Sequence, residues 1–206
     1  MLSVIQARNI IVFPKHNNER IHMLKIYRDV LLPSELKHWQ HTVDNMLIDI
    51  ESDSPMYLMI DQKFVPANTY HRRPGIHVDG YWCEGNKHTG HRPIQASHRP
   101  LPPSHLPNAK TWETAAFEEP EALLLASNVS ACQVYTGEYH GVIGEGGNAE
   151  NINVHHLTKS VLKANICYAG NAALLHETIA LPFDCERTVV RINVPGWSPE
   201  LLKNSA

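Results

Sequence analysis

A histidine and an aspartate stand two residues apart in the stretch "RRPGIHVDGYW", at His77 and Asp79. Proline and glycine bound this stretch, and its short apolar pattern predicts a strand. Side chains at positions i and i+2 of a strand point to the same face, so the imidazole and the carboxylate could reach one ion. In a chain with 14 histidines such a spacing also arises by chance, so a metal site needs a third ligand to support it.

His176 is the candidate for that third ligand. It lies in "YAGNAALLHETIAL", an apolar, strand-like run close to the C-terminus. Two histidines and one carboxylate on one side of an octahedron leave open coordination positions, which is the arrangement that suits non-haem Fe(II). The fold would have to bring His176 beside the His77 segment from almost a hundred residues away in the chain.

Two arginines share one face of the strand predicted in "ERTVVRINVPGW". Arg187 and Arg191 alternate there with apolar residues, and two buried guanidinium groups are costly unless anions compensate them. A dicarboxylate ligand would supply such an anion. The two arginines lie about 13 Å apart along a strand, so only one of them can bind a given carboxylate, and the sequence leaves open which one does.

The order of these residues resembles that of the Fe(II)/2-oxoglutarate-dependent oxygenases: an HxD pair, a distal histidine, and an arginine eleven residues later. The resemblance covers roughly residues 26–197. It implies that His77, Asp79 and His176 bind Fe(II), and that Arg187 binds the far carboxylate of the cosubstrate 2-oxoglutarate. Arg191 would then serve the cosubstrate or an anionic substrate. The resemblance further implies a double-stranded β-helix, or jelly-roll, core and hydroxylation of a substrate with O2.

Gln133 and Tyr135 alternate in "SACQVYTG", on another predicted strand. In a jelly roll, side chains at these positions could line the pocket and hydrogen-bond to 2-oxoglutarate. Ordinary strand packing is an equally good explanation of the same pattern.

The elements that would position these residues are mainly β. The exception is "LLPSELKHWQHTVDNMLIDI", residues 31–50, where the apolar residues follow helical spacing and predict one helix. We expect a single domain over 1–206. Within it, residues 1–54 would form N-terminal strands and a supporting helix, and residues 55–200 a jelly-roll core. A Pro- and His-rich insertion at about 83–120 would be a long loop, and such loops usually serve function.

Composition limits the partners. The chain has 206 residues, 43% of them hydrophobic, with a formal charge of −3, so a globular fold is expected and a long nucleic-acid ligand is disfavoured. A small molecule or a protein side chain remains as the substrate class, together with O2.

No apolar run reaches the roughly 18 residues of a membrane span. Four cysteines without a CxxC motif fit a reducing cytoplasm. Oligomeric state is not indicated.

Two other classes compete with the oxygenase prediction. A cupin-type metalloprotein would use the same ion without 2-oxoglutarate and would not need Arg187 in the pocket. A non-enzymatic jelly-roll protein, with a binding or structural role, would not bring His77 and His176 together. The relative positions of these three side chains therefore separate the classes.

Overall fold

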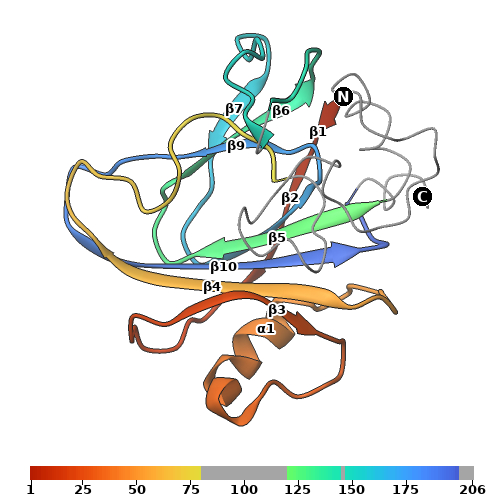
Figure 1. Cartoon of the computed structure of the whole chain (residues 1–206), viewed down its shortest axis with the longest axis vertical. Helices are drawn as coiled ribbons and strands as arrows, with labels where there is room; N and C mark the ends of the chain where they lie inside the picture. Colours follow the sequence, from red (N-terminus) through yellow and green to blue (C-terminus); the bar gives the residue numbers. More distant parts are fainter. Residues whose placement is uncertain (80–119, 145–146, 200–206) are drawn as a thin grey trace.

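Two antiparallel β-sheets dominate the structure, a computed structural model that describes residues 1–79, 120–144 and 147–199 (Figure 1). One sheet has six strands and the other four. A short helical segment lies beyond the six-stranded sheet, on the side away from the four-stranded sheet. The insertion expected at 83–120 falls almost entirely outside the described residues.

The six-stranded sheet carries most of the framework. Its longest strands, β4 and β10, pair along their length in a register that places Val190 opposite Ile60. Because side chains alternate between faces, one face of these two strands is apolar and the other carries the polar residues. Across the sheet the order is β2 (Ile5–Ile10), β8 (Ile166–Asn171), β5 (Glu121–Ser127), β10 (Cys185–Pro195), β4 (Met56–Val65) and β3 (Arg20–Ile26).

The four-stranded sheet is built around β6, which pairs with each of the other three strands. Its members are β1 (Leu2–Ser3), β6 (Cys132–Glu138), β7 (Thr158–Val161) and β9 (Leu175–Thr178). Single bridges continue this sheet beyond β9, because His77 pairs with His176 on one side and with Asn148 on the other.

The helical segment differs from the single helix expected over residues 31–50. It is a 3-10 helix, η1 (Ser34–Trp39), followed by a short α-helix, α1 (Gln40–Met46). Because the segment is divided and α1 has only 7 residues, the prediction of one helix over residues 31–50 is not supported. The first turn is tighter because the Leu36 N–H donates to the Pro33 carbonyl. The chain leaves helical geometry soon after α1, and Asp49 adopts a positive φ of 57°.

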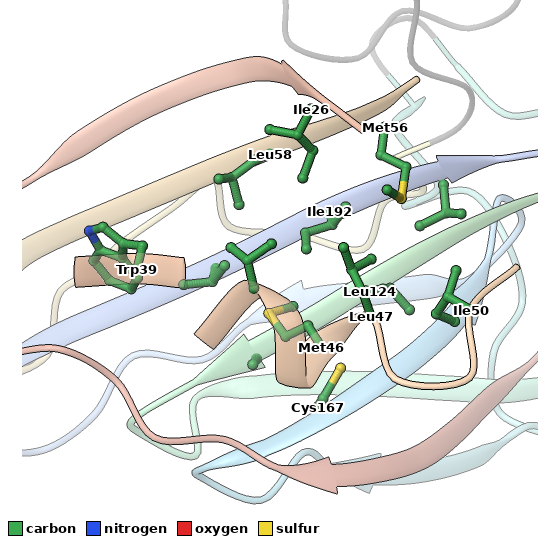
Figure 2. Close-up of a cluster of buried hydrophobic side chains, with 14 of the residues drawn as sticks. Ile26, Trp39, Met46, Leu47, Ile50, Met56, Leu58, Leu124, Cys167 and Ile192 are labelled. Carbon is green, nitrogen blue, oxygen red and sulfur yellow. The ribbon is translucent and has the colours of Figure 1, made fainter. Parts of the chain in front are cut away.

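The apolar residues of this segment nevertheless pack as their spacing suggests. They cover the apolar face of the six-stranded sheet, where Trp39 and Met46 lie over Leu58, Leu124 and Ile192 (Figure 2). The indole Nε1 of Trp39 donates to the Glu19 carboxylate at 2.6 Å, which satisfies the only polar atom of that side chain. This layer covers β4, β5 and β10 on the face away from the four-stranded sheet.

A second apolar cluster joins the two sheets. Met59, Leu125 and Val189 come from the six-stranded sheet, and Val134 and Leu174 from the other side. The sheets therefore pack face to face, with the polar face of β10 turned inward. A third cluster, which includes Val78 and Tyr139, lies on the opposite face of the four-stranded sheet.

Other local expectations need correction. The segment "GIHVDGYW" was expected to be a strand, but residues 75–79 form only two isolated bridges, both at His77, and residues 80–82 lie outside the described residues. The region 154–181 holds three strands, β7, β8 and β9. The N-terminal strands β1, β2 and β3 pair directly with strands of both sheets.

No helix in the described ranges is long and apolar enough to cross a membrane.

The sheet-to-helix layer should dominate stability. Leu58 is 0% exposed within it, so Leu58→Ala should lower the free energy of unfolding by about 2–5 kcal/mol through lost burial and a cavity. Leu31→Ala is a matched control, because Leu31 is 81% exposed and its loss should change stability by less than about 0.5 kcal/mol. Urea unfolding monitored by circular dichroism measures both, and equal effects would contradict this packing.

Candidate metal centre

His77 and His176 are direct neighbours across two chain segments. The His77 N–H donates to the His176 carbonyl at 2.9 Å, and the His176 N–H donates to the His77 carbonyl at 3.0 Å. β6 holds His176 in turn, because β9 pairs with β6 and places His176 opposite Val134. The two imidazole rings therefore lie on the same side, with centroids 4.4 Å apart.

Asp79 completes a cluster with these two histidines. One ligand atom from each residue lies within 4.8 Å of the others, and His176 Nε2 is 3.6 Å from Asp79 Oδ2. The intervening Val78 is fully buried and points to the opposite face, into the apolar cluster there. All three side chains that the sequence predicted as metal ligands are thus brought together.

Both imidazoles are held in the tautomer that a metal ligand needs. His77 Nδ1–H donates to the Gly75 carbonyl at 2.8 Å, and His176 Nδ1–H donates to the Leu174 carbonyl at 3.0 Å. A carbonyl oxygen can only accept, so the proton sits on Nδ1 and the lone pair on Nε2. Burial, followed by the charge of His176, lowers the pKa of His77 to about 3, although Asp79 opposes this. His77 is therefore neutral at pH 7, as metal binding requires.

Arg191 orients the carboxylate of the cluster. Its Nη1 donates to Asp79 Oδ2 at 2.7 Å, and both side chains are buried. Burial lowers the pKa of Arg191 to about 10, so the guanidinium stays protonated at pH 7. A charge-assisted hydrogen bond of this kind holds the Asp79 carboxylate in one orientation, as supporting residues do for carboxylate ligands in metal sites.

A glycine secures the HxD segment from its other side. The Val78 N–H donates to the Gly147 carbonyl at 2.9 Å, and the Ala149 N–H donates to the Ile76 carbonyl at 2.9 Å. Gly147 has a φ of 79°, and a Cβ there would lie 2.1 Å from the Val78 carbonyl oxygen. Nothing in the sequence alone predicts this supporting role of Gly147.

A cavity of about 190 Å³ opens beside the cluster, between the two sheets. Arg187 projects into it from β10, on the same face as Arg191, and is 3% exposed. Arg187 Nη2 donates to the Ala131 carbonyl at 3.2 Å, and its Nε contacts Ser127 Oγ at 3.4 Å. Both predicted arginines therefore face the same cavity as the metal cluster.

Gln133 and Tyr135 do not take the pocket position proposed for them. Strand alternation turns Cys132 toward the cavity and these two residues to the opposite face, where both hydrogen-bond to Glu177. Burial, with the hydrogen bond and charge of Glu177, raises the pKa of Tyr135 to about 12. The alternative of ordinary strand packing describes their surroundings, and the earlier assignment had the strand face reversed.

Comparison of the chain with protein-family models, curated protein sequences and solved structures finds no match. The chemistry of the cluster must therefore be inferred from its own residues. Two imidazoles and one carboxylate lie on one side of a cavity, which leaves space for further ligands on the other side. This donor set suits an octahedral divalent ion with open positions.

The support from Gly147 gives a test that leaves every ligand in place. Gly147→Ala should displace the Val78 backbone and weaken Mn(II) binding about tenfold or more, because a shifted supporting shell misaligns the ligands. Gly144→Ala is the control, since a Cβ there finds its nearest atom at 3.4 Å. The free Mn(II) signal in electron paramagnetic resonance measures the affinity, and equal affinities for the two variants would contradict the assigned role.

The low pKa of His77 predicts a pH dependence of the metal-free chain. Between about pH 3 and 6.5 the unfolded chain protonates this histidine and the folded chain does not, so stability falls as the pH is lowered through that window. From pH 6.5 to 5 the loss should be about 2 kcal/mol. The His77→Gln substitution should remove this loss of stability at low pH. The His155→Gln substitution, at an exposed site, should leave the loss unchanged. Urea unfolding in EDTA at pH 7 and 5 tests this, and an unchanged pH slope in His77→Gln would refute it.

Proposed function

We propose that this chain is an Fe(II)- and 2-oxoglutarate-dependent oxygenase with a jelly-roll core, acting on a small-molecule or side-chain substrate. One observation carries the proposal: His77, Asp79 and His176 converge at one wall of a cavity into which Arg187 also projects. Two packed antiparallel sheets with the cluster between them are consistent with a double-stranded β-helix.

The donor set fits Fe(II). Both imidazoles use Nδ1 for a backbone carbonyl and so have Nε2 left for a metal, and Asp79 supplies the carboxylate of a two-histidine, one-carboxylate site. When bound, the iron would supply the chemistry that reduces O2 as 2-oxoglutarate is converted to succinate and CO2, with the second oxygen atom inserted into a substrate C–H bond. The protein contributes binding, orientation and exclusion of water.

Arg187 is the residue that would bind the far carboxylate of 2-oxoglutarate. Its present partners, Ser127 Oγ and the Ala131 carbonyl, use only part of the donor set of a guanidinium. The remaining N–H groups can form a bidentate pair with a carboxylate, and in a buried setting such a pair is strong and directional. The charge of an incoming carboxylate would also relieve the cost of burying Arg187.

Arg191 has a different task in this proposal. Its Nη1 is committed to Asp79, so it holds a metal ligand and is not the clamp for the cosubstrate. This division favours Arg187 over Arg191 as the residue that would bind the cosubstrate. Both arginines lie on one face of β10, four residues apart, so the proposed clamp and the residue that supports Asp79 belong to the same strand.

Apolar side chains make the surroundings dry. Met59, Leu125 and Val189 line the cavity between the charged groups and are buried. Water exclusion strengthens the ionic contacts of the site and limits side reactions of a reactive intermediate. The same walls would guide the substrate toward the open side of the metal.

The competing classes are less well supported. A cupin-type metalloprotein has no need for a buried arginine in its cavity, yet Arg187 is there. A purely structural protein gives no reason for two histidines to share their backbone hydrogen bonds and present the same ring nitrogen to a cavity. Both observations favour the oxygenase.

Two variants should show that Fe(II) binding and 2-oxoglutarate binding depend on different residues. His176→Ala should abolish Fe(II) binding and, with it, succinate release from 2-oxoglutarate. Arg187→Gln should leave Fe(II) affinity within about twofold of the original and weaken 2-oxoglutarate about tenfold or more, since it removes a charged hydrogen-bonded pair. Anaerobic calorimetric titrations with Fe(II) and then 2-oxoglutarate measure both affinities.

Lys63→Gln provides the matched control. Lys63 lies opposite Arg187 on β4, but it is exposed and is not among the described residues that line the cavity. Its substitution should leave both affinities unchanged. If Arg187→Gln binds 2-oxoglutarate as tightly as Lys63→Gln does, the clamp assignment fails, and if neither protein binds 2-oxoglutarate, the proposed function fails.

A further inference from the structure

The cavity is lined by more positively charged side chains than the proposed metal site and the proposed 2-oxoglutarate-binding arginine need. Among the described residues that line it, five are cationic and one, Asp79, carries a carboxylate. Arg187 and Arg191 are buried, and three further cations line the same cavity: Arg72, Arg73 and Lys163. None of these three was predicted from the sequence, although "RRP" shortly precedes the HxD pair.

Arg72 is built into its position. Its Nη1 donates to Asp61 Oδ2 at 3.1 Å and contacts Met59 Sδ at 3.3 Å, and its side chain is 35% exposed. One edge of the guanidinium is therefore fixed on the wall, while the group has five N–H donors in total. A partly exposed, pre-oriented arginine of this kind can bind an incoming anion with little loss of conformational freedom.

Asp61 does not cancel the positive charge that Arg72 presents to the cavity, because Asp61 itself is not among the described residues that line it. Its carboxylate also receives Arg20 Nε at 3.1 Å and lies 3.4 Å from His71 Nε2. Burial opposes its ionisation, but the hydrogen bond and charge of His71, then Arg72 and Arg20, lower the pKa of Asp61 to about 2. The Asp61 carboxylate is thus shared between two arginines, and the Asp79 carboxylate contacts both Arg191 and His176.

We propose that the substrate of this oxygenase is an anion whose carboxylate or phosphate group binds Arg72, with Arg73 and Lys163 adding attraction. Lys163 is exposed and Arg187 is buried, so the cations extend from the interior of the cavity to its opening. A cavity lined by one sign of charge concentrates ligands of the opposite sign and speeds their entry. That the anion is the substrate rests on the proposed function, whereas the anion site itself rests on the contacts of Arg72.

Titration of the full, metal-free chain tests the anion site without any catalytic step. Inorganic phosphate and benzoate are the two probes, benzamide is the uncharged counterpart of benzoate, and isothermal calorimetry measures each affinity. Phosphate, benzoate or both should bind at millimolar concentrations, and benzamide should not. Preference for one probe identifies the anionic group of the substrate. If neither anion binds, or if benzamide binds as well as benzoate, the proposal is wrong.

Two variants separate recognition from structure. Arg72→Gln should weaken anion binding about tenfold, because it removes the charged donor at the cavity wall. Arg20→Gln also removes a partner of Asp61, but Arg20 is largely exposed and is not among the described lining residues, so affinity should stay within about twofold. Equal affinity in Arg72→Gln and the unaltered chain overturns the proposal, as does an equal loss in both variants.

The outcome is independent of the oxygenase assignment. A chain that binds phosphate or benzoate through Arg72 but does not bind 2-oxoglutarate would retain the anion site and lose the proposed function. A chain that binds 2-oxoglutarate through Arg187 but shows no effect of Arg72→Gln would retain the function and lose this substrate class.

Discussion

The reciprocal backbone hydrogen bonds between His77 and His176 are the constraint on which the candidate site depends. A hydrogen-bonded antiparallel pair holds its two Cα atoms about 5.5 Å apart and directs both side chains to one side. Two imidazoles that are far apart in the chain thereby become neighbours through main-chain contacts alone. Because side chains alternate along the extended segment, Asp79 lies on the same side as His77. The Val78 side chain between them points to the opposite side and packs in the apolar cluster there.

Each further layer stabilises that pairing. β6 holds β9, Gly147 holds the HxD segment from its other side, and the inter-sheet cluster with Met59 and Val189 keeps the two sheets at packing distance. β10 then brings Arg191 to Asp79 from the opposite sheet. Because the cluster lies at the four-stranded sheet and its supporting Arg191 comes from the six-stranded sheet, the geometry of the cluster depends on how the sheets pack. Loss of either support should therefore displace candidate ligands that are themselves unchanged.

The sequence was most informative where a residue's type and its alternation acted together. His77, Asp79 and His176 could be selected as a group because few other residue types bind metal, and the two arginines of β10 could be placed on one face by counting. The same counting failed at Gln133 and Tyr135, because a strand's period does not say which face is inward. Arg72 was missed because its role depends on Asp61 and Met59, which belong to another strand. The helix over 31–50 was overextended because apolar spacing does not distinguish 3-10 from α geometry.

Diffraction from crystals of the chain loaded anaerobically with Fe(II), recorded at the iron absorption edge, tests the central claim most directly. The account predicts one strong anomalous peak within bonding distance of Nε2 of His77, Nε2 of His176 and a carboxylate oxygen of Asp79. A peak bound elsewhere, or no peak between these three side chains at full iron loading, would contradict it.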